Sequence, residues 1–266
     1  MPKIKIGIAG CLGRMGKELI NAVESDSRLK YIGGFDKPDK LKGTNLLRPK
    51  VFKEADVIID FSSPIASVHN ARDAVFDGCV SKFGSKKTAL VIGTTGLSKS
   101  QIKQIQEHSK KIPILMSSNM SLGVNLLFEL VKNSSTKLNS KDYDIEISET
   151  HHKHKVDAPS GTALSLGEFA AKGRGVNLSQ KKVIDRMSKS GRLENKRRQG
   201  QIGFSVTRGG EIAGEHTVSF IGENDRIDIT HKANNRSIFV RGAIEAAIFI
   251  FKKKQGLYSV KDMVKF

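Results

Sequence analysis

The chain has 266 residues, of which 38% are hydrophobic and 27% charged, with a formal net charge of +18. This is the balance of a globular protein of one or two domains, and no run of about 18 apolar residues predicts a membrane span. The start lacks the features of a secretory signal, and two cysteines, Cys11 and Cys79, do not make a disulfide framework, so we expect a cytoplasmic protein.

The first half of the chain alternates short apolar segments with amphipathic ones. Strands are expected at 3–9, 29–36, 55–63, 88–96 and 112–120. Helices are expected at 14–25, 64–78 and 98–111. This alternation with short connections is typical of an α/β fold with a doubly wound parallel sheet.

The second half has a different pattern. A helix is expected at 123–138, followed by a half-exposed strand at 143–150. Three alternating segments, 201–210, 214–222 and 225–233, indicate an antiparallel or mixed sheet, and an apolar helix at 239–254 closes the chain. We therefore expect an inserted α+β domain, with the last helix packing back on the first domain.

A glycine-rich stretch, "GIAGCLGRMG", links the first strand to the first helix and contains Gly7, Gly10, Gly13 and Gly16. Glycines there permit a tight turn and let a pyrophosphate approach the amides that open the helix. The fit to G-x-G-x-x-G is imperfect, because Leu12 occupies one glycine position. A turn that serves packing alone is the alternative interpretation.

Three other segments fit a dinucleotide. Asp36 ends the second strand, where a carboxylate accepts hydrogen bonds from ribose hydroxyls, and Lys37 beside it can meet a 2′-phosphate. The loops 93–96 and 117–120 follow the fourth and fifth strands, at the strand ends where ligands bind in such sheets. The alternatives are an ordinary surface pair and ordinary turns.

Residues 149–164 read "ETHHKHKVDAPSGTAL", which places three histidines and two lysines in five positions. The cluster fits a solvated basic loop, a metal site, or a site for an anionic substrate with a proton donor. A metal is disfavoured, because His151 and His152 point to opposite sides of an extended chain and Lys153 and Lys155 repel a cation.

The anionic-substrate interpretation explains the turn that follows. Ser160 is expected to cap a helix from about Gly161 to Lys172, which leaves the amides of Gly161 and Thr162 at the positive end of the helix dipole. Lys155 adds a positive charge, and an imidazole can donate a proton near neutral pH. Such a site binds and protonates a small carboxylic acid; beside a hydride-bearing cofactor, the natural chemistry is reduction.

These segments, with "GRMG", "GTTG", "SSNMSLGVN" and "RGGEIAGEHTVSF", closely resemble the dihydrodipicolinate reductases, now called 4-hydroxy-tetrahydrodipicolinate reductases, of the diaminopimelate route to lysine. The resemblance covers the whole chain. It implies a Rossmann-like dinucleotide-binding domain from 1–121 and 233–266, and a substrate-binding and tetramerisation domain at 122–232. It also implies NADH or NADPH as cofactor, no metal, and a homotetramer.

The resemblance also implies roles for single residues. His151 is the expected general acid, and Lys155 a second proton donor. The residues expected to bind the substrate dicarboxylate are His152, Lys155, Gly161 and Thr162. Those expected to line the cofactor are Gly10, Cys11, Leu12, Gly13, Arg14, Met15, Asp36, Lys37, Gly93, Thr94, Thr95, Ser117, Ser118, Asn119 and Met120.

Two departures from the family pattern stand out. Leu12 replaces a glycine of the usual G-x-G-G-R-M-G, and Asp36–Lys37 replaces the Glu-Arg pair of some members. Because Lys lacks the bidentate fork of Arg, we do not expect a strong preference for NADPH over NADH.

Rival interpretations stay open at this point. A homoserine or diaminopimelate dehydrogenase would keep the cofactor domain but would need another substrate loop. The net charge of +18 suggests a nucleic-acid partner. The lysines are scattered, however, and the chain has no Trp and only three Tyr for base stacking, so we expect no nucleic-acid partner.

Overall fold

The computed structural model describes residues 2–37, 48–76, 88–184 and 196–264, so Cys79 lies outside the described residues. The chain divides into two compact units. The first unit contains Met1–Leu122 and Ser237–Phe266, and the second contains Gly123–Arg236.

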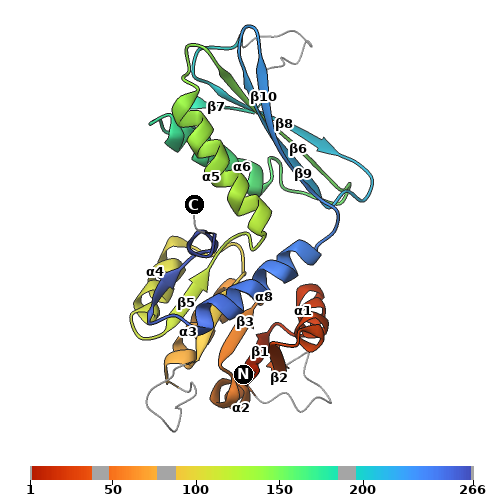
Figure 1. Cartoon of the computed structure of the whole chain (residues 1–266), viewed down its shortest axis with the longest axis vertical. Helices are drawn as coiled ribbons and strands as arrows, with labels where there is room; N and C mark the ends of the chain where they lie inside the picture. The colour runs from red at the N-terminus through yellow and green to blue at the C-terminus, as the bar shows by residue number, and fades with distance from the viewer. Residues whose placement is uncertain (1, 38–47, 77–87, 185–195, 265–266) are drawn as a thin grey trace. The chain divides into compact units, whose positions relative to one another are not determined.

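The first unit is built on a parallel sheet (Figure 1). Its six strands lie in the order β2 (Leu29–Phe35), β1 (Ile4–Ala9), β3 (Val57–Asp60), β4 (Ala89–Ile92), β5 (Pro113–Met116) and β11 (Gly256–Tyr258). Five of these strands were predicted from the sequence. The sixth, β11, was not, because three residues carry no strand pattern of their own.

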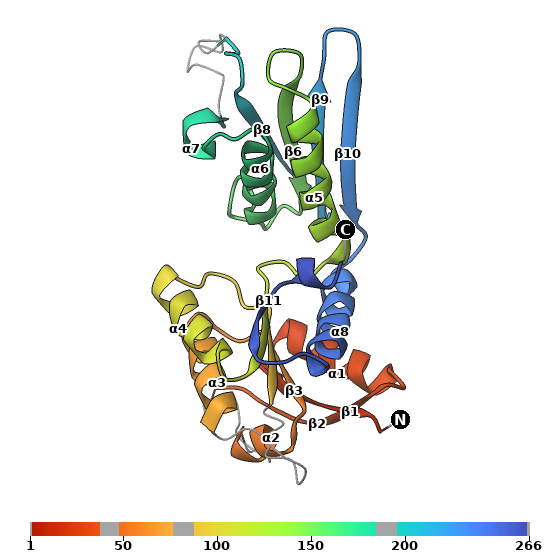
Figure 2. The same ribbon diagram turned by 60° about the vertical axis from the view of Figure 1, so that its left-hand side comes forward.

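Helices cover both faces of this sheet (Figure 2). One face packs on α1 (Arg14–Ser25) and α8 (Ser237–Phe251), and the other on α2 (Arg48–Glu54), α3 (Pro64–Phe76) and α4 (Lys99–Ser109). Successive residues of β3 alternate between the two apolar clusters, since Val57 and Ile59 join one and Ile58 the other. Burial on both faces explains why this strand is almost purely apolar.

The second unit is a mixed sheet with helices on one face. Its strands lie in the order β10 (Arg226–Ala233), β9 (Gly214–Ile221), β6 (Asp144–His151), β8 (Ile202–Arg208) and β7 (Lys182–Val183). β6 is antiparallel to β9 and parallel to β8. The helices α5 (Leu122–Lys137) and α6 (Gly161–Gly173) pack on the face that carries Ile145, Ile147 and Val218, and the short α7 (Leu178–Lys181) joins this core (Figures 1 and 2).

The structure confirms the predicted fold class: a Rossmann-like parallel sheet together with an α+β unit, and a closing helix, α8, that packs on the first sheet. A 3-10 turn, η2 (Val260–Asp262), follows β11. Among the helices within the described ranges, none has the length and apolar character that a membrane crossing requires.

Candidate active site

The histidine–lysine segment begins at the end of β6. His151 is the last residue of that strand and shares a face with Glu149, two positions earlier. Both side chains are buried, with 10% of the His151 side chain and 1% of the Glu149 side chain exposed. Nδ1 of His151 is hydrogen bonded to Oε2 of Glu149. The imidazole that the sequence singled out is therefore fixed by a buried carboxylate.

Arg208 completes this pair from the neighbouring strand, where it lies in register with His151. Its Nη1 and Nη2 each donate to one oxygen of Glu149, both at 2.8 Å, and the amide of Ser160 donates to Oε1 at 3.0 Å. Burial raises the pKa of Glu149, but Arg208, His151 and the Ser160 amide outweigh it and hold that pKa below its usual value. Glu149 is therefore an ionised acceptor.

His216 closes the cluster from β9, opposite Glu149. Its ring lies edge-on to the His151 ring, with 5.0 Å between centroids, and its Nε2 is 3.1 Å from Oγ of Ser160. Burial, together with the neighbouring His151, lowers the pKa of His216 to about 4, so this imidazole is neutral at pH 7. Sequence reasoning assigned no role to Glu149, Arg208 or His216.

The start of α6 forms the second part of the site. The prediction that Ser160 caps this helix is confirmed, because its Oγ accepts from the Ala163 amide at 3.1 Å. Gly161 is exposed, and a Cβ built on it would meet no atom of the described residues within 4 Å. The space beside Cα of Gly161, where a side chain would lie, is therefore open.

A carboxylate of the chain itself lies against this opening. Nζ of Lys155 is 2.7 Å from Oδ1 of Asp157. Lys155, with a smaller contribution from the Gly161 amide, lowers the pKa of Asp157. The two groups that the sequence assigned to a substrate carboxylate thus already stabilise a carboxylate.

His152 and Thr162 are the two other residues predicted to bind the substrate. His152 is half-buried, and its ring centroid is 6.2 Å from that of His154. Its Nδ1 is buried and has no hydrogen-bond partner among the described residues. Thr162 is half-buried in the first turn of α6. Within the described parts of the chain, no group of three or more His, Cys, Asp or Glu is arranged to hold a metal ion.

The glycine loop of the first unit leaves no room for side chains at two positions. Gly10 has a φ of +78°, and a Cβ there would lie 2.7 Å from the carbonyl oxygen of Phe61. A Cβ on Gly16 would lie 2.2 Å from the carbonyl oxygen of Gly10. Gly13 is the N-cap of α1 and supplies no side-chain cap, and the first turn holds no acidic residue. The leading amides of α1 therefore fit an anionic group such as a pyrophosphate.

Asp36 ties the end of β2 to this loop. Its Oδ2 accepts from the Leu12 amide at 3.1 Å, and its Oδ1 accepts from the Lys37 amide at 2.8 Å. Each oxygen keeps capacity for another donor, such as a ribose hydroxyl. Cys11 is buried, and burial and Asp36 raise the pKa of its thiol, so it is not a thiolate. Arg14 is exposed and Met15 half-buried on α1.

A buried polar network joins the loops after β3 and β4. Asp60 is fully buried and accepts from the Ser62 amide at 2.9 Å and from Nδ2 of Asn70 at 2.8 Å, and burial raises its pKa. Thr94 accepts from the Ser67 hydroxyl at 2.9 Å. A Cβ on Gly93 would overlap the ring of Phe61. The predicted loop 93–95 is thus held by its surroundings, with Thr95 exposed.

The loop after β5 is held by its own hydrogen bonds. The Ser117 hydroxyl donates to the carbonyl of Asn119 at 2.7 Å, and Oδ1 of Asn119 accepts from the Ser121 amide at 2.9 Å. Ser118 is exposed, whereas Met120 is buried against α8, where only a glycine fits at position 242.

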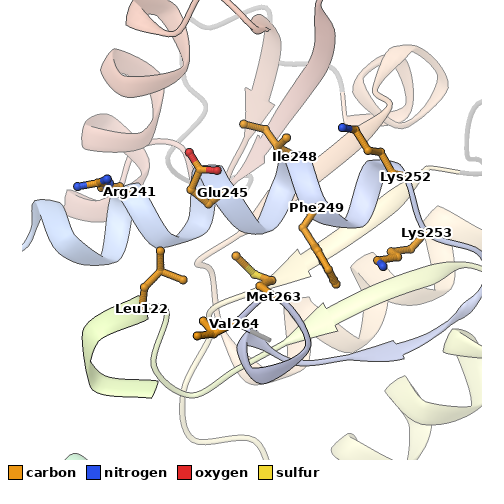
Figure 3. A pocket seen from close by; sticks show the side chains of 9 residues that line it. All are labelled: Leu122, Arg241, Glu245, Ile248, Phe249, Lys252, Lys253, Met263 and Val264. Carbon is orange, nitrogen blue, oxygen red and sulfur yellow. The ribbon is translucent and has the colours of Figure 1, made fainter. Parts of the chain in front are cut away.

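A pocket of about 700 Å³ also opens along α8 (Figure 3). Phe249 points toward Met263 there, and the cations Arg241, Lys252 and Lys253 stand around the apolar side chains. No residue that the sequence assigned to cofactor or substrate lines this pocket, so we assign it no part in the site.

Known proteins match the chain over almost its full length. The family described as "Dihydrodipicolinate reductase, N-terminus" matches residues 4–120, and "Dihydrodipicolinate reductase, C-terminus" matches residues 123–264. A 4-hydroxy-tetrahydrodipicolinate reductase of Caulobacter vibrioides is 44% identical over 263 residues, which cover 99% of this chain and 98% of the relative. A reductase of the same name from Sulfurovum sp. is 43% identical over 265 residues, and the match covers 97% of this chain and 98% of the relative.

A solved structure has a similar fold. The dipicolinate-bound dihydrodipicolinate reductase from Paenisporosarcina sp. TG-14 superposes with a TM-score of 0.76 at 20% sequence identity, covering 99% of this chain and 100% of that one. At this identity the likeness bears on the fold alone.

Proposed function

The chain belongs to the dihydrodipicolinate reductase family, and from this premise we propose that it reduces 4-hydroxy-tetrahydrodipicolinate to tetrahydrodipicolinate in the diaminopimelate route to lysine, with a nicotinamide cofactor. The observation that carries the proposal is the pairing of an open helix start at Gly161 and Lys155 with the buried, oriented imidazole of His151. An anion receptor next to an acid suits a carboxylated substrate that must gain a proton.

The second unit supplies the groups that bind the substrate and hold its proton. When bound, the reduced nicotinamide supplies a hydride to ring carbon C4 of the dehydrated substrate. Lys155 and the amides of Gly161 and Thr162 hold a substrate carboxylate in place of the carboxylate of Asp157, and His152 contacts the dicarboxylate. His151 holds a proton at Nε2, since Nδ1 is engaged by Glu149, and donates it as negative charge moves toward the ring nitrogen and C3.

The first unit supplies the residues that would hold the cofactor. We assign the pyrophosphate to the loop from Gly10 to Met15 and the adenosine ribose to Asp36, supported by the uncapped start of α1 and the spare acceptor capacity of the carboxylate. Lys37, which is exposed, faces a 2′-phosphate when NADPH binds. We propose that both NADH and NADPH are accepted.

The assembly is proposed to be a homotetramer that works in the cytoplasm. The face of the second sheet that α5 and α6 leave uncovered supports self-association, because it is regular and rich in small polar side chains. These side chains are Ser148, Thr150, Ser205, Thr207, Thr217 and Thr230. Light scattering on the purified chain should give four times the mass of one chain; the mass of a single chain would contradict the tetramer.

The activity is tested in a coupled assay. Substrate is generated by the preceding synthase, and oxidation of NADH or NADPH is followed at its absorbance band. We expect oxidation that depends on both the synthase product and the chain, and that is about 10²-fold slower or more in His151→Gln. Absence of oxidation with either cofactor, in a folded protein, would overturn the proposed function.

A further inference from the structure

We infer that Glu149 and Arg208 are positioning residues for His151: Glu149 fixes which imidazole nitrogen carries the exchangeable proton, and Arg208 limits how firmly Glu149 holds the imidazolium. This inference deepens the proposed function, because it concerns the group assigned there as the acid. Neither residue had been singled out from the sequence.

The hydrogen bonds of Glu149 dictate the tautomer. Oε1 accepts from the Ser160 amide and from Arg208, and Oε2 accepts from Arg208 and from His151. An ionised carboxylate only accepts, so Nδ1 of His151 must carry a hydrogen in both protonation states. The proton that His151 releases and takes up is therefore the one on Nε2.

Gly214, at the start of β9, packs against the Nε2 side of the His151 ring. A Cβ built on it would lie 2.8 Å from Nε2, so a side chain at this position would displace the imidazole. The backbone agrees, since Gly214 has a φ of +155°, which side-chain-bearing residues rarely adopt. A glycine at this position is therefore needed to keep His151 in the orientation that Glu149 fixes.

The charged groups that face His151 act on its pKa in opposite directions. They are Glu149 on β6, Arg208 on β8 and Lys155 in the loop. Two further titratable groups lie on the other side, His216 on β9 and, beyond it, His231 on β10. Burial lowers the pKa of His151, Glu149 raises it, and Lys155 and Arg208 lower it again, so that it lies below the ordinary value of imidazole. His216 is neutral and adds no charge at pH 7.

Arg208 has two effects on this balance. It repels the imidazolium directly, and its two hydrogen bonds neutralise the carboxylate that would otherwise retain the proton. Glu149 and Arg208 together thus keep the His151 imidazole oriented without making its imidazolium form a poor proton donor. Removing either partner must change the acidity of His151, and the two removals must change it in opposite directions.

The test is a titration of ligand-free protein carrying ¹⁵N-labelled histidine, followed by NMR. In the wild type, neutral His151 should be the Nδ1–H tautomer. In Glu149→Gln the midpoint should move to lower pH, and the tautomer should change to Nε2–H, because the amide that replaces Oε2 donates to Nδ1. In Arg208→Gln the midpoint should move to higher pH, and neutral His151 should remain the Nδ1–H tautomer. In Arg208→Lys, which keeps a positive charge at this position, the midpoint should lie closer to the wild-type value than in Arg208→Gln.

The matched control is Lys153→Gln, which removes an exposed cation of the same segment that pairs with Glu211 at 3.7 Å. It should leave the His151 midpoint unchanged. Midpoints that move in the same direction in Glu149→Gln and Arg208→Gln, or a neutral wild-type His151 protonated on Nε2, would overturn the inference. If Glu149→Gln does not fold, the Arg208→Gln and Arg208→Lys pair still tests the direction.

Kinetics connect the inference to the reaction. A general acid must be protonated to act, so the alkaline limb of kcat/KM should follow the His151 midpoint in each variant, to lower pH in Glu149→Gln and to higher pH in Arg208→Gln. At neutral pH, kcat of Glu149→Gln should fall about tenfold or more with little change in KM. If the His151 midpoints shift as expected but the protein shows no turnover, the proposed function is refuted and the inference stands. If the protein turns over substrate but the alkaline limb of kcat/KM does not move in the variants, the inference is refuted.

Discussion

Gly161→Ala separates binding of the substrate from stability of the fold. Among the residues that the structure describes, the added methyl group meets nothing within 4 Å, and alanine is the better helix former. Because Gly161 is the first residue of α6, the free energy of unfolding should stay unchanged or rise by at most about 0.5–1 kcal/mol, the value for a glycine inside a helix. Under the proposed function, the same methyl group would obstruct a substrate carboxylate that binds the first amides of α6. Losing one charge-assisted hydrogen bond costs about 1.5–3 kcal/mol, which corresponds to a rise in KM of about 10- to 150-fold.

The assay is steady-state kinetics with synthase-generated substrate, together with chemical unfolding of the same protein samples. Gly173→Ala is the matched control at the other end of the helix, where the new Cβ would lie 2.4 Å from the carbonyl oxygen of Lys132. It should lower stability and leave KM unchanged. If Gly161→Ala kept the wild-type KM for the substrate, the assignment of the helix start as the carboxylate receptor would be refuted.

His151→Gln should lower kcat by about 10²-fold or more with little change in KM, as expected for a lost general acid, whereas Lys155→Ala should raise KM as well; wild-type turnover in both would contradict these roles. The pH dependence of unfolding should report His216, whose pKa falls from 6.5 to about 4 on folding. Because the unfolded chain takes up the proton first, the free energy of unfolding should fall by about 3 kcal/mol as the pH drops through that interval. His216→Phe should lose this part of the dependence, and equal slopes in both proteins would count against a buried neutral imidazole. Finally, kcat/KM for NADPH should exceed that for NADH by less than about 100-fold, equivalent to about 2.7 kcal/mol; a larger ratio would refute the role given to Asp36 and Lys37.

Much of the fold could be predicted because local pattern decides it. The purely apolar run at Val57–Asp60 signals a strand buried on both faces, and Ser160 before Gly161 signals a capped helix. By contrast, β11 is a strand only because it pairs with β5, and nothing in its three residues requires this. The local periodicity of a sequence does not predict which distant segments pair as strands.

The candidate site shows the same division. His151 and Lys155 stand out by composition, and Glu149 could have been found, because it continues the apolar face of Ile145 and Ile147 and a carboxylate buried there needs a partner. Arg208 could not, since its place beside His151 depends on the parallel register of β6 and β8. A sequence shows which face a residue occupies but not which residue lies across from it.

A crystal structure with pyridine-2,6-dicarboxylate, a planar stand-in for the substrate ring, tests the central claim most directly. We predict one carboxylate of the ligand on the amides of Gly161 and Thr162 and on Nζ of Lys155, with Asp157 displaced and Nε2 of His151 facing the ring. A ligand bound away from α6, with the Lys155–Asp157 pair intact, would contradict the account.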